Sequence, residues 1–427
     1  MRWSLIWLSA LLLANAPGAS AQSVARMATW NLAWMLDKAT FERWSAACEA
    51  LNWADGASSS DTTLPFCDVH SGMAWPLKAC LRNQPGGQAP LPKSRYPQEH
   101  ACRTSKDLRT WPAFMSKVEA IRGVVRQLKR DGVTVVALQE VSSADAARLV
   151  FPPEDGWQVA TTAETKSNRQ HRIAQHVGVA YQNSAGVKNI GVLDDLAVQG
   201  KDGRFTRPGL TFSMPINGRS TTWLVVHLKA GCRSQVISEP GAARTFPDDK
   251  NEPAEEYDAR NARLQNDCAA LRLQVPVLEN WLDTQLGRDR TAAVGMVGDF
   301  NRSILNELGK PARIDDKESA AAPITLDTKI ARLLPELSDG APPGARLTVV
   351  RPNYKGVSQR EVCGTRRGTQ GIDLFLLSSG LARLLQSASE AQARIASTVI
   401  PFGDASYGPD KALVSDHCPH VLDLGKS

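Results

Sequence analysis

Six short apolar runs, spread over almost the whole chain, each lie beside an acid, amide or imidazole side chain. Runs of this length and composition predict buried β-strands. A strand that ends in a polar group holds that group rigidly at the edge of a sheet, where a bound cation can offset the cost of burying it. The six polar segments are Asn31, Gln139-Glu140, His227, Gly298-Asp299-Phe300-Asn301, Gly371-Ile372-Asp373 and Ser415-Asp416-His417.

This pattern has two possible interpretations, and its recurrence along the chain favours one of them. A single Asp or Asn after a strand is most often a turn former or a helix cap. Six such segments in one chain indicate a shared site instead. Carboxylate and amide oxygens suit a hard cation such as Mg²⁺, and an imidazole held by a carboxylate suits proton transfer. Hydrolysis of a phosphodiester, a stable anion, needs both kinds of group.

The strands and one helix can be placed from the apolar pattern. The apolar stripe Phe114, Val118, Ile121, Val124-Val125 and Leu128 predicts a helix, which Gly132 closes before the next strand. The predicted strands are 28–30, 133–138, 223–226, 292–297, 372–377 and 421–422.

The N-terminal residues predict a secretory signal peptide over residues 1–21. Arg2 precedes an apolar stretch that reaches Leu13, and Ala19-Ser20-Ala21 supplies small residues for cleavage. A membrane anchor is the alternative, but the apolar stretch is short for one and Pro17-Gly18 ends it. We therefore expect a secreted or periplasmic protein with no stable membrane insertion after the signal is removed.

Export changes how the eight cysteines are interpreted, because disulfides persist in oxidising compartments. Zinc binding is the alternative, but no Cys-x-x-Cys pair occurs. The first four cysteines are expected to pair among themselves, and Cys232 with Cys268. The four are Cys48, Cys67, Cys80 and Cys102, and the other two are Cys363 and Cys418.

Residues 22–427 are expected to form a single domain, since the strands extend over nearly all of them. Two insertions interrupt it, a Cys-rich one at about 41–105 and a second at about 231–268, inferred from their loop-forming composition.

These segments, in this order, resemble the endonuclease/exonuclease/phosphatase superfamily and its deoxyribonuclease I-like fold, and the chain is similar to an exported bacterial-type member. The matching motifs include Thr29-Trp30-Asn31, Leu138-Gln139-Glu140 and Val226-His227-Leu228, with the three later segments given above. The resemblance implies an α/β fold, a four-layer α/β/β/α sandwich of two mixed sheets flanked by helices. It also implies a Mg²⁺-dependent phosphoric ester hydrolase, with Mn²⁺ or Ca²⁺ as alternative cations.

The resemblance further implies roles for individual residues. Glu140 would bind the metal with Asn31 beside it and Asp416 contributing. Asp299 and Asn301 would position the attacking water and a phosphate oxygen. The remaining roles are as follows: Asp373 would orient His417, His227 would be a second imidazole at the phosphate, and Arg207 would contact the phosphate.

One stretch departs from the family pattern, which often has a tyrosine or second acid after the Glu motif. Residues 168–176 contain no tyrosine. Two interpretations stay open: a basic side chain approaches phosphate instead, or the stretch is a solvated basic loop. The candidates are Arg169, His171, Arg172 and His176.

Charge bears on the substrate. The chain carries 50 Lys and Arg against 44 Asp and Glu, and this formal charge of +6 favours a polyanion. Three basic clusters, 169–172, 201–207 and Arg366-Arg367, could track phosphates. We expect an endonuclease that hydrolyses DNA, with RNA as an alternative, by metal-activated in-line attack of water assisted by a His/Asp pair; no protein partner is expected. The competing interpretations are a phosphatase or a phospholipid or sphingolipid phosphodiesterase of the same fold, and an inactive exported binding protein.

Overall fold

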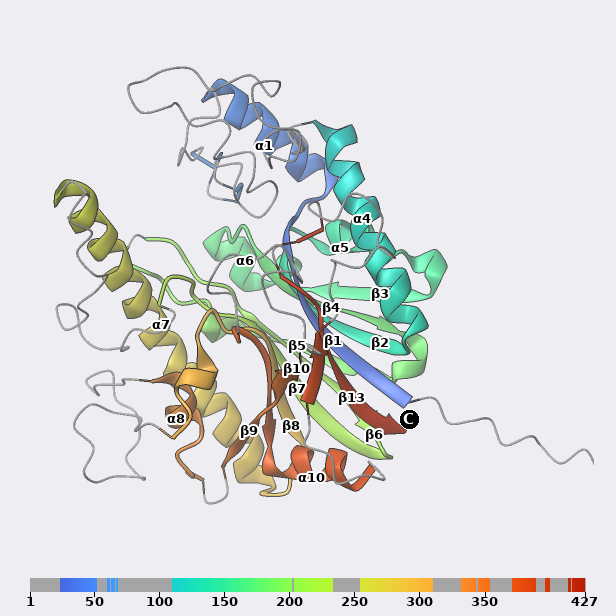
Figure 1. Cartoon of the computed structure of the whole chain (residues 1–427). Coiled ribbons are helices and arrows are strands. Elements are labelled where there is room, and N and C mark those ends of the chain that lie inside the picture. The colour runs from blue at the N-terminus through green and yellow to red at the C-terminus, as the bar shows by residue number, and fades with distance from the viewer. Residues whose placement is uncertain are drawn as a thin grey trace, which may run out of the picture.

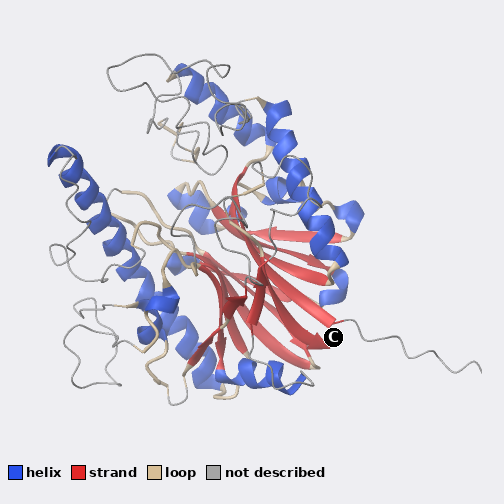
Figure 2. Ribbon diagram, viewed as in Figure 1, coloured by secondary structure: helices blue, strands red, loops and turns tan. Residues whose placement is uncertain are grey.

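A computed structural model of the chain has two packed β-sheets with helices on their outer faces (Figures 1 and 2). It describes residues 24–51, 60–61, 63–65, 67, 110–201, 203–232, 254–309, 332–342, 345–353, 371–388, 396–399, 414–415 and 417–426. The predicted signal peptide, much of the Cys-rich insertion, Asp416 and Arg366-Arg367 lie outside these residues.

The first sheet has seven strands in the order β10-β12-β13-β1-β2-β4-β3. Its central strand β1 pairs parallel with β2 and antiparallel with β13, which joins the two ends of the described chain. The strands are β1 Val24–Met35, β2 Val133–Val141, β3 Trp157–Thr161, β4 His176–Gln182, β10 Arg351–Asn353, β12 Ala396–Val399 and β13 His420–Lys426.

The second sheet has six strands in the order β5-β6-β7-β8-β11-β9. Its centre is formed by β7, which pairs parallel with β8, and by β11, which pairs antiparallel with β8. The strands are β5 Lys188–Leu193, β6 Gly209–Ile216, β7 Arg219–His227, β8 Val294–Asp299, β9 Leu347–Val349 and β11 Asp373–Ser378.

Helices cover the outer face of each sheet (Figure 1). On the first sheet lie α1 (Lys38–Ala50), α4 (Trp111–Arg130) and the short α5 (Ala144–Arg148). On the second lie α7 (Ala254–Arg288) and α8 (Leu333–Leu337). Two further helices are α6 (Lys166–His171) and α10 (Ser379–Ala388). Among the residues searched, the helices fall short of the length and apolar character that crossing a membrane requires.

Alternation along the strands divides the core into three layers. In β2, Val136 and Leu138 pack toward α4, while Val135 and Ala137 pack into the cluster between the sheets. Because successive side chains of a strand point to opposite faces, one strand serves two layers. The second sheet shows the same alternation, because in β8 Met296 packs toward α7 and Val297 packs between the sheets.

The predicted fold class is confirmed, since the layers follow the order helix, sheet, sheet, helix. The six predicted strands all occur, in β1, β2, β7, β8, β11 and β13. The predicted helix is α4, and Gly132 follows it with the positive φ of 81° that suits glycine after a helix.

Candidate active site

The ends of strands from both sheets bring the predicted residues together. Asn31 lies in β1, where the pairing with β2 shifts register between Asn31 and Met35. Glu140 lies near the end of β2 with a φ of 60°. Left-handed backbone at a non-glycine residue carries strain, which a protein retains where the surrounding structure enforces it.

The side-chain amide of Asn31 connects the two sheets. Its Nδ2 donates to Oε1 of Glu140 over 3.2 Å and to Oδ2 of Asp299 over 3.1 Å. The other oxygen of Glu140 accepts from the backbone N–H of Trp34 over 3.1 Å. A carboxylate of the first sheet and one of the second are therefore held against the same amide group.

Register places three of the predicted residues side by side in the second sheet. His227 of β7 pairs with Asp299 of β8, and Asp299 pairs with Asp373 of β11. Paired residues on neighbouring strands point to the same face, so these three side chains form a row. Gly298 permits the close approach before Asp299, because a Cβ there would lie 2.1 Å from the carbonyl oxygen of Val226.

His417 completes the row from the other sheet. Its Nδ1 lies 2.7 Å from Oδ2 of Asp373, and both residues are buried. The backbone around it is tied to β1: Ser415 Oγ accepts from the His417 N–H and donates to the carbonyl oxygen of Asn31, over 3.0 and 2.7 Å. Trp30 Nε1 donates to the His417 carbonyl over 3.0 Å.

Burial sets the protonation of Asp299. It raises the pKa of that carboxyl from the ordinary 3.8 to about 7, and repulsion from Asp373 adds to the effect. His417, the Asn301 N–H and the Asn31 amide act in the opposite direction. Two buried carboxyls side by side hold a proton more readily than isolated ones because a second negative charge is costly there.

His227 is buried in its neutral form. Burial lowers the pKa of its imidazole well below 6.5, and the positive charges of Arg207 and His417 lower it further. Its Nε2 lies 3.8 Å from Glu140 Oε1 and 3.7 Å from Asp299 Oδ2, too far for hydrogen bonds, while its Nδ1 is buried without a protein partner. A histidine that served only to pack the core would have a hydrogen-bond partner for this buried nitrogen.

Arg207 lies in the loop before β6, and its side chain extends toward Glu140 and Asp299. Its guanidinium donates to the Leu228 carbonyl over 3.2 Å and to the side-chain oxygen of Gln175. Burial lowers the pKa of Arg207, and Glu140 and Asp299 oppose that shift. The Leu228 carbonyl also accepts from Asn301 Nδ2 over 3.1 Å, so a single backbone oxygen holds both residues.

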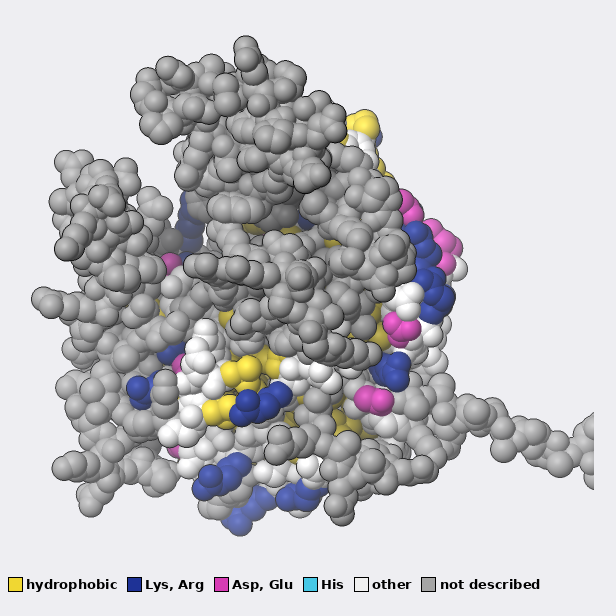
Figure 3. Space-filling model, in the orientation of Figure 1, with side chains coloured by type: hydrophobic (Ala, Val, Ile, Leu, Met, Phe, Trp, Pro, Cys, Tyr) yellow, Lys and Arg dark blue, Asp and Glu magenta, His cyan; other side chains and the backbone are white. Residues whose placement is uncertain are grey.

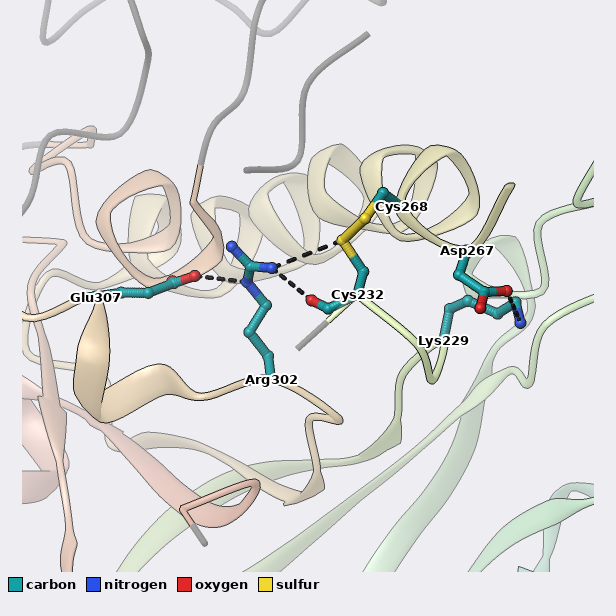
Figure 4. Close-up of a disulfide and its surroundings, with 6 residues drawn as sticks. All are labelled: Lys229, Cys232, Asp267, Cys268, Arg302 and Glu307. Carbon is teal, nitrogen blue, oxygen red and sulfur yellow. Dashed lines mark hydrogen bonds and ion pairs between the residues drawn. A yellow bond between two sulfur atoms is a disulfide. The ribbon is translucent and has the colours of Figure 1, made fainter. Parts of the chain in front are cut away.

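A disulfide and the buried ion pair of Arg302 and Glu307 lie next to each other, on the segments that follow β7 and β8 (Figure 4). Cys232 and Cys268 form the disulfide predicted from the sequence, which joins the segment after β7 to α7. Arg302 pairs with Glu307 over 2.5 Å and donates to the Cys232 carbonyl over 2.5 Å.

The other cysteine predictions are confirmed in part. Cys48 pairs with Cys67, two of the four cysteines expected to pair among themselves, and Cys418 is also in a disulfide. Cys80, Cys102 and Cys363 lie outside the described residues, as does the predicted metal ligand Asp416.

The basic residues of 168–176 do not gather at the carboxylates. Arg172 pairs with Asp61 over 2.9 Å, and the ring of His171 stacks on Phe205. His176 is buried beside Thr162, and burial lowers its pKa to about 4. The side chain of Arg169 lies outside the description.

The donor set fits a divalent cation. Ligand atoms of Asp299, Asp373 and His417 all lie within 4.8 Å of one another, and Asp373 Oδ1 is buried without a protein partner. Glu140 approaches the same cluster through Asn31. Oxygen-rich sites of this kind suit Mg²⁺, and a cation would favour the charged form of Asp299 that burial disfavours.

The sequence matches neither a protein-family model nor a curated protein. Solved structures do match it. TDP2 from D. rerio, complexed with a single-strand DNA product, is 10% identical with a TM-score of 0.37, and the match covers 72% of this chain and 92% of that chain. The catalytic domain of human Nocturnin, with bound sulfate, is 12% identical with a TM-score of 0.35, covering 74% and 86%. ANGEL2, a 2′,3′-cyclic phosphatase in complex with adenosine-2′,3′-vanadate, is 13% identical with a TM-score of 0.38, covering 74% and 86%. Likeness of this degree carries no information on substrate.

The fold and the site agree with the resemblance found in the sequence. Two mixed sheets pack between helices, and Asn31, Glu140, His227, Asp299, Asp373 and His417 meet where strands of the two sheets end. The chain therefore has the four-layer sandwich that this resemblance implies, with a buried cluster of Asp299, Asp373 and His417.

Proposed function

We propose that the protein is a Mg²⁺-dependent phosphodiesterase, and an endonuclease that acts on DNA. The observation that carries this proposal is the Asn31 amide, which holds Glu140 and Asp299 together from two sheets beside the Asp373–His417 pair. Hydrolysis of a phosphodiester needs a cation site and an imidazole of fixed orientation that can contact the same phosphate, and this cluster supplies both.

Glu140 and Asp299 would hold the cation, with Asn31 fixing their separation. A bound Mg²⁺ would neutralise negative charge on a non-bridging phosphate oxygen. Asp299 would orient the attacking water and accept its proton, because its carboxylate would be charged when a cation is bound. Asn301, whose N–H donates to Asp299 over 2.7 Å, would orient a phosphate oxygen.

The two imidazoles would do different work. Asp373 fixes the orientation of His417 through Nδ1, and Nε2–H of the protonated imidazole would donate to the phosphate. His227 is kept neutral by burial and can donate or accept one hydrogen bond without adding charge. Arg207, held by the Leu228 carbonyl, would supply a fixed positive charge at the phosphate.

DNA is proposed as the substrate because a net charge of +6 favours a polyanion. The Lys and Arg side chains drawn in Figure 3 lie in separate groups, with Asp and Glu among those at the right-hand edge. The charge of the surface therefore supports DNA as the substrate less strongly than the active-site residues do.

Export from the cytosol is part of the proposal. It is supported by the apolar N-terminal segment with its small residues and by the Cys48–Cys67 and Cys232–Cys268 disulfides.

Plasmid nicking by the purified, oxidised protein tests the proposed function. We expect cleavage with Mg²⁺, none with EDTA, and none with Asp299→Ala. A matched control is Asp423→Ala, which removes an exposed carboxylate from β13. A folded and oxidised wild type that cleaves neither the plasmid nor a single-stranded oligonucleotide would exclude a DNA endonuclease; turnover of a lipid or a phosphomonoester would then favour those members of the fold.

A further inference from the structure

A pocket adjoins the carboxylate cluster, and most of its described lining has no role in the chemistry proposed above. It is lined by Trp34, by residues 171–175, by the loop that holds Phe205 and Arg207, and by Lys229-Ala230. Its volume is about 290 Å³, near the lower end for small-molecule sites. Arg207 belongs to both places, because it lines the pocket and lies close enough to feel the charges of Glu140 and Asp299.

Trp34 connects the pocket directly to the predicted metal ligand. Its backbone N–H donates to Oε2 of Glu140, while its partly buried side chain lines the pocket. Trp34 has a φ of 61° and Ala33 one of 52°. Consecutive left-handed residues without glycine, one of them bulky, are a strained arrangement of the kind that accumulates at functional sites. This backbone conformation holds the N–H of Trp34 against Glu140, at the edge of the catalytic cluster.

The rest of the lining combines aromatic rings and cations with apolar and neutral polar residues. The rings of His171 and Phe205 stack with centroids 3.6 Å apart and planes 17° from parallel. Arg172, Arg204 and Lys229 also line the pocket, and Asp and Glu are missing from its described lining. Part of this charge is balanced outside it, since Arg172 pairs with Asp61 and Lys229 with Asp267.

We propose that this pocket takes the unpaired base and sugar of one nucleotide next to the scissile phosphate, and that the enzyme therefore prefers single-stranded nucleic acid. The inference rests on the proposed function and names its substrate more closely. A nucleotide combines a flat ring, which stacks on aromatic side chains, with a phosphate, which arginine and lysine bind. An acyl chain would match the aromatic part alone.

The pocket is too small to admit a base that is still paired and stacked within a duplex. A base within a duplex is paired and stacked on both sides, so it reaches a pocket between loops only by leaving the helix, which costs a few kcal/mol. A base in a single strand avoids most of that cost. Preference for unpaired substrate follows from where Trp34 lies, independently of base identity, because every base has a face that stacks.

The test compares a diester without a base and a diester of thymidine that have the same leaving group. Methyl p-nitrophenyl phosphate has no base, whereas the p-nitrophenyl phosphates of thymidine, esterified at the 3′ or the 5′ oxygen, place a base on one side of the phosphate. The ratio of their kcat/KM values measures base recognition apart from the chemistry. We expect Trp34→Leu, which keeps apolar bulk but removes the ring, to lower this ratio by roughly 5- to 100-fold.

Further variants keep the result interpretable if Trp34→Leu folds poorly. Trp34→Phe should restore most of the ratio, and Phe205→Leu should lower it. Trp111→Leu is the matched control, because Trp111 is also partly buried but stacks on Phe114 in α4; it should leave the ratio unchanged. Wild-type enzyme should also cleave a single-stranded oligonucleotide faster than the same sequence in a duplex.

The outcomes separate the two proposals. If wild-type enzyme hydrolyses both diesters but Trp34→Leu and Phe205→Leu leave their ratio within about 2-fold of the wild type, the base pocket is wrong and the phosphodiesterase stands. Equal rates on single strand and duplex would likewise overturn the pocket. If wild-type enzyme hydrolyses neither diester nor DNA, the proposed function fails and the pocket inference fails with it.

Discussion

Nδ1 of His417 lies 2.7 Å from Oδ2 of Asp373, across 44 residues of sequence, and this contact joins β11 of the second sheet to the segment that leads into β13 of the first. The contact fixes which imidazole nitrogen faces the cluster, because Nδ1 is engaged by the carboxylate. It also makes Asp373 the residue whose charge stabilises protonated His417.

Asp373→Asn tests this pair. An amide of the same shape keeps the packing but removes the negative charge. Its oxygen can still accept a hydrogen bond from Nδ1–H of His417, but a weaker one. We expect kcat to fall by roughly 10²- to 10⁴-fold, as for loss of general acid–base catalysis, with KM changed much less. Asp423→Asn at an exposed ion pair is the control. A loss of less than about 10-fold would mean that the pair has no catalytic role.

The stability of the cation-free protein should fall as pH rises from about 4 to about 7. Over that range folded Asp299 keeps a proton that the unfolded chain has released, because burial raises its pKa from 3.8 to about 7. Above about 7 the carboxylate is charged in both states and the cost of burying it is complete. A bound cation offsets that cost.

Melting temperatures measured with EDTA and with Mg²⁺ check this expectation. The gain from Mg²⁺ should be larger near pH 8 than near pH 5, and Asp299→Asn should remove most of the difference. An equal gain at both ends of the range would show that Asp299 does not titrate with cation binding.

Arg207→Met should separate cation binding from turnover. Removing the guanidinium takes away a positive charge that faces Glu140 and Asp299, so the cation should bind more tightly. The same change removes a charge that stabilises the transition state, so kcat should fall by about 10²-fold. Calorimetric titration with Mn²⁺ and steady-state kinetics measure the two effects. Weaker cation binding together with unchanged kcat would contradict the role given to Arg207.

The two described disulfides should differ in their effect on activity. Replacing Cys232 and Cys268 by serine opens a loop of 36 residues and should cost about 4 kcal/mol in the chain-entropy model, against about 3 kcal/mol for the 19-residue loop of Cys48 and Cys67. Loss of the first pair should also lower kcat, because the Cys232 carbonyl holds Arg302, the residue after Asn301.

Urea unfolding and kinetics under conditions where both variants are folded distinguish the effects. The Cys48/Cys67 variant serves as the control for lost stability alone. If both variants lose kcat equally, Cys232 has no special connection to the site.

Six of the strands and α4 could be predicted from sequence because their signals are local, whereas the four-layer sandwich was implied by the family resemblance. Each buried strand is an apolar run, and α4 shows its stripe from Phe114 to Leu128. The polar ends of the strands mark the site for the same reason: the alternation and termination of a strand determine where Glu140, Asp299 and Asp373 point.

The parts that depend on backbone conformation could not be predicted. Nothing in Ala33-Trp34 indicates left-handed backbone, since neither is glycine, yet that conformation turns Trp34 toward Glu140. Arg302 was also missed, because its partners Cys232 and Glu307 become neighbours only through the disulfide and the turn after β8. The role of the stretch 168–176 could not be predicted either, because Arg172, His176 and His171 meet their partners Asp61, Thr162 and Phe205 only in the folded chain.

One divalent cation shared by side chains of both sheets would make this cluster a hydrolase. Anomalous diffraction from crystals soaked in MnCl₂ tests that directly. We predict a peak within about 2.0 to 2.6 Å of a Glu140 carboxylate oxygen, with an Asp299 oxygen in or beside its coordination shell, and its loss in Glu140→Gln. Saturating Mn²⁺ that leaves Glu140 without a peak would contradict the proposed site.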